Sequence, residues 1–253
     1  MIKQNLKYLI LAFSFIPLTQ SMAQRSIEDA FNRKHEFELD RFQFIRIKHE
    51  SPEIPYAYAM QFFRNGEAPW AHDFPTAEYN MYDILAQRTA IKVTGDPRVL
   101  TFDDDEIFDY PVLYICEIGY WKLSDERAQR LGEYLKRGGF MIVDDFRMLH
   151  ELDSFREQMR KAVPEFTESP LKADHAIFNC YFEFPTLPLE TPYNRFGPPV
   201  FYGWFDEDGR LAAIVNYNND IGDGWEIARV TTRRFSASSF MLGINYFIYS
   251  LTH

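Results

Sequence analysis

The stretch YLKRGGFMIVDDF, residues 134–146, reads as the end of a helix, two glycines, an apolar strand and two adjacent aspartates. Glycine commonly ends helices, and basic side chains such as Lys136 and Arg137 favour the last turn. The uninterrupted apolar run FMIV is typical of a strand that is buried on both faces. This order predicts helices packed on a parallel sheet, with Asp144 and Asp145 at the carboxyl end of one strand.

The sequence before residue 166 repeats this alternation of strands and helices. Further strands are expected at residues 42–47, 90–93 and 112–116. Helices are expected at residues 73–88, 125–137 and 153–163. Asp73 and Ser124 can cap the first two of these helices, since short polar side chains accept hydrogen bonds from free N–H groups. The pattern predicts an α/β fold with a parallel sheet covered on both faces.

The sequence after residue 166 has a different texture, with short strands, prolines and turns. Residues 199–218 predict a β-hairpin that turns at Asp208-Gly209. Residues 236–253 predict a final helix with one apolar face. Residues 48–71 look like a long loop with a short ordered piece. With 253 residues and 46% hydrophobic side chains, the chain can build an ample core.

The first 23 residues have the features of a secretory signal peptide. These are two basic residues, an apolar run and two small residues before the cleavage point: Lys3, Lys7, residues 8–18, Ser21 and Ala23. The apolar run is short for a membrane span, which takes about 20 residues. We therefore expect cleavage after Ala23 and a periplasmic or secreted protein; a retained anchor is the alternative.

No cysteine stands directly after the apolar run, where a lipid anchor would be attached, so we do not expect a lipoprotein. The mature chain would consist of a lead-in over residues 24–41 and one domain over residues 42–253. Cleavage leaves 25 basic and 37 acidic residues, a formal charge of −12. An acidic chain without a basic stripe argues against nucleic acid and anionic membranes as partners. No later segment predicts a membrane span.

Two cysteines, Cys116 and Cys180, lie in apolar strand-like runs. In an oxidising compartment they can form a disulfide, whereas burial in a core favours free thiols equally well. Both alternatives stay open at the level of sequence.

Asp144 and Asp145 are the candidate catalytic residues and the centre of the predicted site. Ligands of open parallel sheets bind at the carboxyl ends of the strands, and Glu117 follows the neighbouring strand at the same edge. The alternative is structural: one or both aspartates accept backbone N–H groups of the next turn.

Other polar and aromatic residues are candidates for ligand binding at the same edge: Trp70, Asp73, Glu78, His175 and Asp220. Asp73 has the alternative role of helix cap, and His175 that of a hydrogen-bonded turn residue. Asp220 and Asp223 lie in an oxygen-rich loop that can hold a hard divalent cation, although its spacing differs from the calcium-binding hand. No other cofactor is expected.

Four tryptophans stand in loop-like contexts: Trp70, Trp121, Trp204 and Trp225. Aromatic faces beside carboxylates suit sugars or cationic groups, and covering the core is their alternative role. The chain lacks a G-x-S-x-G or G-x-C-x-G elbow, a phosphate loop, an H-E-x-x-H pair and a Cys/His metal cluster. Aspartate therefore takes the strand-end position where such folds often present a nucleophile.

Several longer segments carry a resemblance to a known family: FIRIKH, AHDFPTAEYN, DDDEIFDYPVLYICEIG, LSDERAQRLGEYLKRGGFMIVDDF, DHAIFNCYF, GWFDEDGRLAAIVNYNNDIGDGWE and MLGINYFIYSLTH. The chain resembles the bacterial domain-of-unknown-function family 4159 over residues 42–253. That family is similar to class I glutamine-amidotransferase-like domains and to trehalose-utilisation-type proteins. The resemblance implies a flavodoxin-like three-layer sandwich with a mostly parallel central sheet, followed by the C-terminal hairpin and helix.

Glutamine amidotransferases use a cysteine nucleophile on an elbow, with a histidine and an acid downstream. Asp144 and Asp145 occupy the elbow region in this chain, and Cys116 lacks the glycines of an elbow. The Cys-His-acid triad is therefore expected to be absent. We expect an exported module that binds a small molecule, a saccharide or an envelope protein, and lean away from an enzyme. A carboxylate- or metal-dependent hydrolase and a scaffold subunit of an envelope complex are the alternatives.

Overall fold

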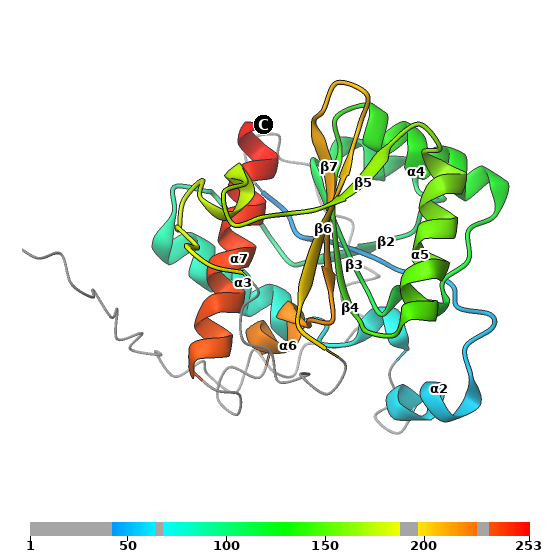
Figure 1. The fold of residues 1–253 in the computed structure, drawn as a ribbon. Helices are drawn as coiled ribbons and strands as arrows, with labels where there is room; N and C mark the ends of the chain where they lie inside the picture. Colours follow the sequence, from blue (N-terminus) through cyan, green and yellow to red (C-terminus); the bar gives the residue numbers. More distant parts are fainter. Residues whose placement is uncertain (1–41, 64–67, 188–196, 227–232) are drawn as a thin grey trace, which may run out of the picture.

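The computed structural model describes residues 42–63, 68–187, 197–226 and 233–253. The expected signal peptide and lead-in, residues 1–23 and 24–41, lie outside the described residues. The described chain forms an α/β fold with a seven-stranded sheet and six α-helices (Figure 1).

The sheet is mixed, which corrects the expectation of a mostly parallel sheet. Its strands lie in the order β2 (Arg98–Leu100), β1 (Ile45–Ile47), β3 (Val112–Cys116), β4 (Phe140–Phe146), β7 (Leu211–Tyr217), β6 (Val200–Phe205) and β5 (Thr167–Pro170). The strands from β2 to β7 in this order run parallel, whereas β6 and β5 are antiparallel to their neighbours. A short hairpin connection can join only antiparallel strands, so the chain after residue 166 changes the character of the sheet.

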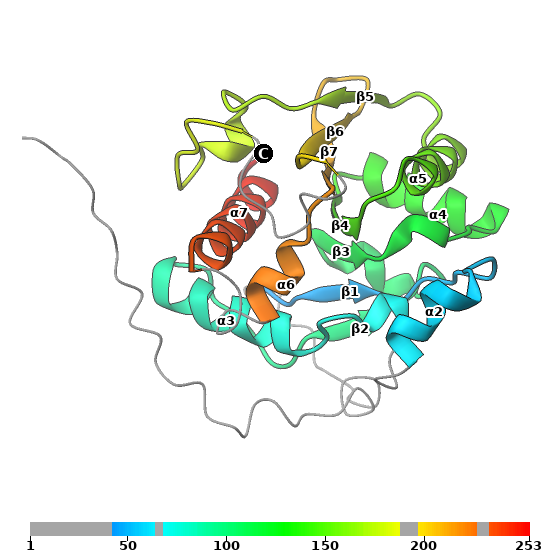
Figure 2. The ribbon, with the colours of Figure 1, turned by 60° about the horizontal axis from the view of Figure 1, so that its bottom comes forward.

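Helices cover both faces of the sheet (Figures 1 and 2). One face carries α4 (Asp125–Lys136) and α5 (Leu149–Ala162), and the other carries α3 (Thr76–Arg88), α6 (Ile221–Glu226) and α7 (Arg233–Thr252). The sixth helix, α2 (Tyr56–Phe63), lies beside the edge where β4 ends (Figure 2). In the described ranges, four short 3₁₀ helices lie between these elements: Pro69–Ala71, Asp105–Asp109, Ile118–Tyr120 and Ala176–Phe178.

The two central strands are buried on both faces, as the apolar runs predict. Alternate residues of β3 and β4 enter two separate hydrophobic clusters. Leu113, Ile115, Met141 and Val143 pack toward α4 and α5. Tyr114 and its alternating neighbours pack toward α3 and α7. Burial on both faces fixes the register of β4 and hence the point at which Asp144 and Asp145 leave the core.

Several local predictions are confirmed. Ser124 caps α4 by accepting a hydrogen bond from the backbone N–H of Arg127 at 3.2 Å. The hairpin joins β6 and β7, and Gly209 in its turn has the positive φ of +81° that favours glycine. The final helix is α7.

Other local predictions are wrong in extent. The expected strand over residues 90–93 is a single bridge between Val93 and Phe42, and β2 replaces it five residues later. Helix α5 begins at Leu149, four residues before the expected start. Helix α3 begins at Thr76 without a side-chain cap, so Asp73 is not its cap. Asp73 is thereby available for another role.

Both cysteines are free thiols, so the disulfide alternative is wrong for this structure. Cys116 is buried at the end of β3 and Cys180 is half-buried. Among the described residues, no helix combines the length and the apolar character that crossing a membrane requires.

Helix α4 approaches α5 closely at Gly132, where a Cβ atom would lie 2.3 Å from the carbonyl oxygen of Ala162. We expect Gly132→Ala to lower the free energy of unfolding by about 1–3 kcal/mol, because overpacking outweighs the better helix propensity of alanine. Urea unfolding measures this change. Gln129→Ala, at an exposed position of α4, serves as control. Equal stability of Gly132→Ala and the wild type would contradict the close approach.

Candidate functional site

The two adjacent aspartates have different partners. Asp144 accepts hydrogen bonds from the Tyr114 hydroxyl at 2.8 Å, the Gly222 N–H at 2.9 Å and the Ile221 N–H at 3.2 Å. These contacts attach the first turn of α6 to β4. The structural alternative therefore describes Asp144, although its backbone donors come from α6 and not from the following turn. Burial and the neighbouring Asp145 raise the pKa of Asp144 to about 6, against the effect of its donors.

Asp145 faces a different group of side chains. Its φ of 54° is in the left-handed region, and the pairing of β4 with β7 shifts register between Val143 and Phe146. Asp145 forms an ion pair with Arg147, whose Nη2 also lies 3.0 Å from Oδ2 of Asp220. Burial raises the pKa of Asp145, but Arg147 and His72 outweigh burial and bring this pKa below its ordinary value. Asp145 is therefore a buried carboxylate that stays ionised.

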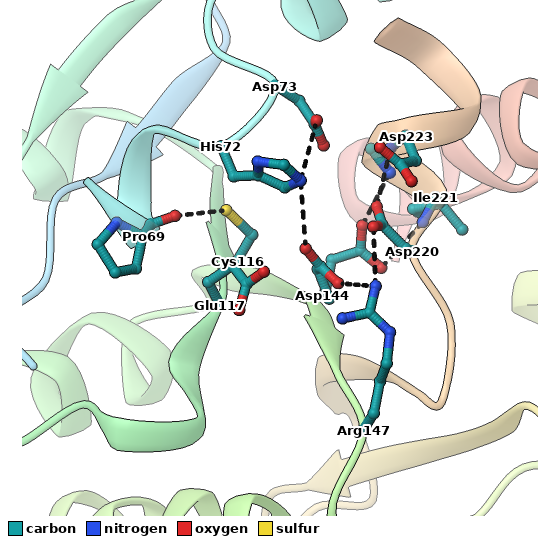
Figure 3. A network of polar contacts seen from close by, with 12 residues as sticks. Pro69, His72, Asp73, Cys116, Glu117, Asp144, Arg147, Asp220, Ile221 and Asp223 are labelled. Atoms are coloured by element: carbon teal, nitrogen blue, oxygen red, sulfur yellow. Dashed lines mark hydrogen bonds and ion pairs between the residues drawn. The ribbon is translucent and has the colours of Figure 1, made fainter. Parts of the chain in front are cut away.

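Five acids from four segments of the chain surround this point, and we call them the acid cluster. They are Asp73, Glu117, Asp145, Asp220 and Asp223, and each is at most 9% exposed. Figure 3 shows Asp220 and Asp223 at α6 facing His72 and Asp73, with Arg147 reaching up from the end of β4. Four of these acids, all except Asp223, are ligand-binding candidates from the sequence alone, and the geometry brings all four together. Asp223, expected only as a metal ligand, joins them.

The backbone at the acid cluster has unusual dihedral angles. Four non-glycine residues of the described chain have positive φ, and three of them belong to the cluster: Asp73 at 66°, Glu117 at 53° and Asp145 at 54°. Such conformations cost free energy and persist where surrounding contacts enforce them. The fold therefore directs these three carboxylates inward at some cost in stability.

His72 lies between the carboxylates. Its Nε2 is 3.5 Å from Oδ1 of Asp73 and 4.0 Å from Oδ2 of Asp145. Two sets of possible ligand atoms for a metal ion include this histidine: His72 with Asp145 and Asp220, and His72 with Asp73 and Asp223. Within each set all ligand atoms lie within 4.8 Å of one another.

The electrostatics of the cluster are dominated by burial and like charge. Burial and neighbouring carboxylates raise the pKa of Asp73, Glu117 and Asp220 well above the ordinary range. The same causes raise the pKa of Asp223 to about 6. Glu117 also accepts a hydrogen bond from the Tyr58 hydroxyl of α2. Without a further positive charge, burial and mutual repulsion therefore favour the protonated form of these carboxyl groups.

Glu78 lies near this site but is already paired. It forms a buried ion pair with Arg46 at 2.5 Å, and both side chains are 0% exposed. Arg46 also donates to the carbonyl oxygen of His72 at 3.0 Å and to that of Trp70 at 3.4 Å. Glu78 and Arg46 therefore fix the segment that carries His72 and Asp73.

His175 is placed elsewhere. It caps the 3₁₀ helix Ala176–Phe178 and its ring contacts Phe205. Phe205 pairs with Leu211 at the start of β7, whereas the acid cluster lies at the other end of that strand. The four tryptophans are buried, with Trp70 the most exposed at 8%. The expectation of tryptophan faces open to a ligand is therefore wrong, and their alternative role in the core holds.

Cys116 is not in the environment of an activated nucleophile. Its Sγ lies 2.8 Å from Nη1 of Arg46, and burial raises the thiol pKa well above its ordinary value. The nearby His49 uses Nε2 to bond the backbone oxygen of Cys116 at 2.8 Å. Burial lowers the pKa of His49 to about 4, so this histidine is neutral.

Sequence reasoning missed two contributors to the site, Arg147 and Tyr58, and gave a third, His72, no role of its own. His72 and Arg147 are each within two residues of a predicted acid, and this proximity was the available signal. Tyr58 comes from a segment expected to be mostly loop, and the sequence offered no signal for its contact with Glu117.

The chain belongs to the family described as domain of unknown function (DUF4159), whose model matches residues 57–251. This match confirms the family resemblance, and it includes every residue of the acid cluster. No curated protein matches the chain.

We expect Asp144→Ala to lower the free energy of unfolding by about 3 kcal/mol or more, because it leaves three buried donors without an acceptor. Tyr114→Phe removes one of these hydrogen bonds and should cost about 1 kcal/mol. Urea unfolding of both variants gives the comparison. A loss no larger for Asp144→Ala than for Tyr114→Phe would contradict the role of Asp144 as anchor of α6.

Proposed function

We propose that this protein is an exported ligand-binding domain that holds a small, positively charged ligand within the acid cluster. The observation that carries the proposal is the convergence of buried carboxylates from four segments of the chain, three of them on positive-φ backbone. Burying carboxylates together is costly unless they are paired. A cationic ligand supplies the compensating charge and makes this arrangement favourable.

The environment of Cys116 supports binding without amidotransferase chemistry. The thiol is buried beside a guanidinium, and its histidine neighbour contacts the backbone and not the sulfur. For the fold, we propose a flavodoxin-like three-layer arrangement related to class I glutamine-amidotransferase-like domains. The parallel order β2-β1-β3-β4-β7, with helices on both faces, supports this placement.

A carboxylate-dependent hydrolase is the second candidate. Opposite pKa shifts within one group of acids are typical of general acid and base pairs. The pKa of Asp145 is lowered, whereas the pKa of the adjacent Glu117 is raised. In this alternative Asp145 is the base and Glu117 the acid.

We expect thermal-shift screening to separate cationic from neutral ligands. A panel of divalent ions, diamines, cationic peptides and neutral sugars should raise Tm only for positively charged members. At about 100 times Kd the stabilisation would be about 2.7 kcal/mol. Asp145→Asn should abolish the shift, whereas Asp153→Asn, a 74% exposed carboxylate on α5, should retain it. Stabilisation by neutral sugars alone, or by no member of the panel, would reject the proposal.

For the compartment, we propose export through residues 1–23. The basic start, the apolar run and the small residues before Gln24 support cleavage after Ala23. The intact mass of the protein from a periplasmic fraction should correspond to residues 24–253. Ala23→Phe should block processing, because signal peptidase sites need a small residue at this position. A full-length mass in the periplasmic fraction would favour a retained anchor.

A further inference from the structure

We infer that the ligand of the acid cluster is a divalent first-row transition-metal ion, bound by the imidazole of His72 together with surrounding aspartates. This inference rests on the proposed function and names its ligand. The two candidate sets of ligand atoms share His72, which is grouped with Asp145 and Asp220 in one set and with Asp73 and Asp223 in the other. An ion bound by this imidazole therefore has carboxylates from three segments of the chain within reach.

The spacing of the ligand atoms fits a small ion. A tetrahedral ion with bonds of about 2.1 Å holds its ligand atoms about 3.4 Å apart. The Nε2 atom of His72 lies 3.5 Å from Oδ1 of Asp73 and 4.0 Å from Oδ2 of Asp145. If the two aspartates moved toward Nε2 by a few tenths of an ångström, these distances would match those around a bound ion.

Asp73 provides a second observation. Its side chain is 2% exposed, and Oδ1 has no hydrogen-bond partner among the residues that the structure describes. The side chain is held on the far side by α6, since a Cβ atom added to Gly222 would lie 2.6 Å from Oδ2. A buried carboxylate oxygen normally finds a donor or a metal. Here Oδ1 faces His72 Nε2, at the position where an ion would be shared.

The charge of the site favours a dication. Asp73, Asp145, Asp220 and Asp223 carry four negative charges when ionised, and the one positive charge of Arg147 contacts two of them through Nη2. A divalent ion compensates two of the remaining three charges. In this arrangement Arg147 orients the carboxylates from behind, as outer-shell partners of metal ligands do.

The exposure of the side chains at the site and the type of their ligand atoms indicate which kind of cation the site binds. Asp145 and Asp220 are at most 1% exposed, whereas the His72 side chain is 30% exposed and marks the way in. A small ion needs less space beside these buried carboxylates than a diamine or a peptide side chain does. An imidazole ligand favours Zn²⁺ over Ca²⁺, which takes oxygen ligands, and the surrounding aspartates also suit Mn²⁺.

Isothermal titration with Zn²⁺ and Mn²⁺, after removal of bound metal by a chelator, tests the inference. One equivalent per chain is the expected result for at least one of the two ions. His72→Gln, Asp73→Asn and Asp220→Asn should each weaken binding by about tenfold or more. His150→Gln, at an exposed histidine, and Asp153→Asn should bind like the wild type.

Thermal unfolding in the presence of a chelator shows whether a variant binds metal weakly because it lacks a ligand atom or because its fold is destabilised. Asp73→Asn removes repulsion between buried carboxylates, so its Tm without metal should equal or exceed that of the wild type. Asp220→Asn also loses an ion pair with Arg147, so Asp73→Asn is the variant for this comparison. Binding below about 0.1 equivalent by the wild type, or unchanged affinity in all three site variants, overturns the inference. If a diamine or cationic peptide then stabilises the protein through Asp145, the proposed function stands without the metal. If no cation binds, both fall.

Discussion

The arrangement of the site depends on one buried contact, the attachment of α6 to β4 by Asp144. A single carboxylate accepts the N–H groups of Ile221 and Gly222 and the hydroxyl of Tyr114. Helix α6 follows β7 directly, and β7 lies next to β4 in the sheet. Asp144 therefore sets the distance between the end of β4 and the start of α6. Asp220 and Asp223 face Asp145 because Asp144 holds the two segments together.

The neighbouring Asp145 does not stabilise the fold in this way, because its conformation departs from that of a regular strand. A regular strand would point Asp145 to the other face of the sheet from Asp144. The register shift after Val143 and the left-handed conformation of Asp145 break this alternation. Asp73 and Glu117 take the same conformation in segments far apart in the sequence. Three independent departures from ordinary backbone geometry at one place are hard to explain by stability, since each one costs free energy. Their common effect is to bring carboxylates together.

The position of this edge can be predicted from the sequence because the signals for it are local. The apolar runs of β3 and β4 predict strands buried on both faces, and the residues that follow a buried strand must lie at its edge. The hairpin and the caps of α4 are equally local. The antiparallel side of the sheet depends on which strand β7 pairs with. Tertiary packing decides this pairing, so a local sequence pattern does not predict it. The start of α3 was also predicted wrongly. Asp73 fits the sequence pattern of a helix cap, but its positive φ directs its side chain toward the acid cluster and not toward the first turn of α3.

A local sequence pattern does not reveal contacts between residues that are far apart in the chain. Arg147 and His72 acquire their importance from partners more than 70 residues away, Asp220 for the first and Asp145 for the second. The tryptophans show the opposite error, since they were expected to line the site and are buried in the core. Their loop-like surroundings in the sequence gave no signal of this burial. A platform of exposed indole rings would have favoured a sugar. The buried acids and the one imidazole that they share support the proposal of a small, positively charged ligand.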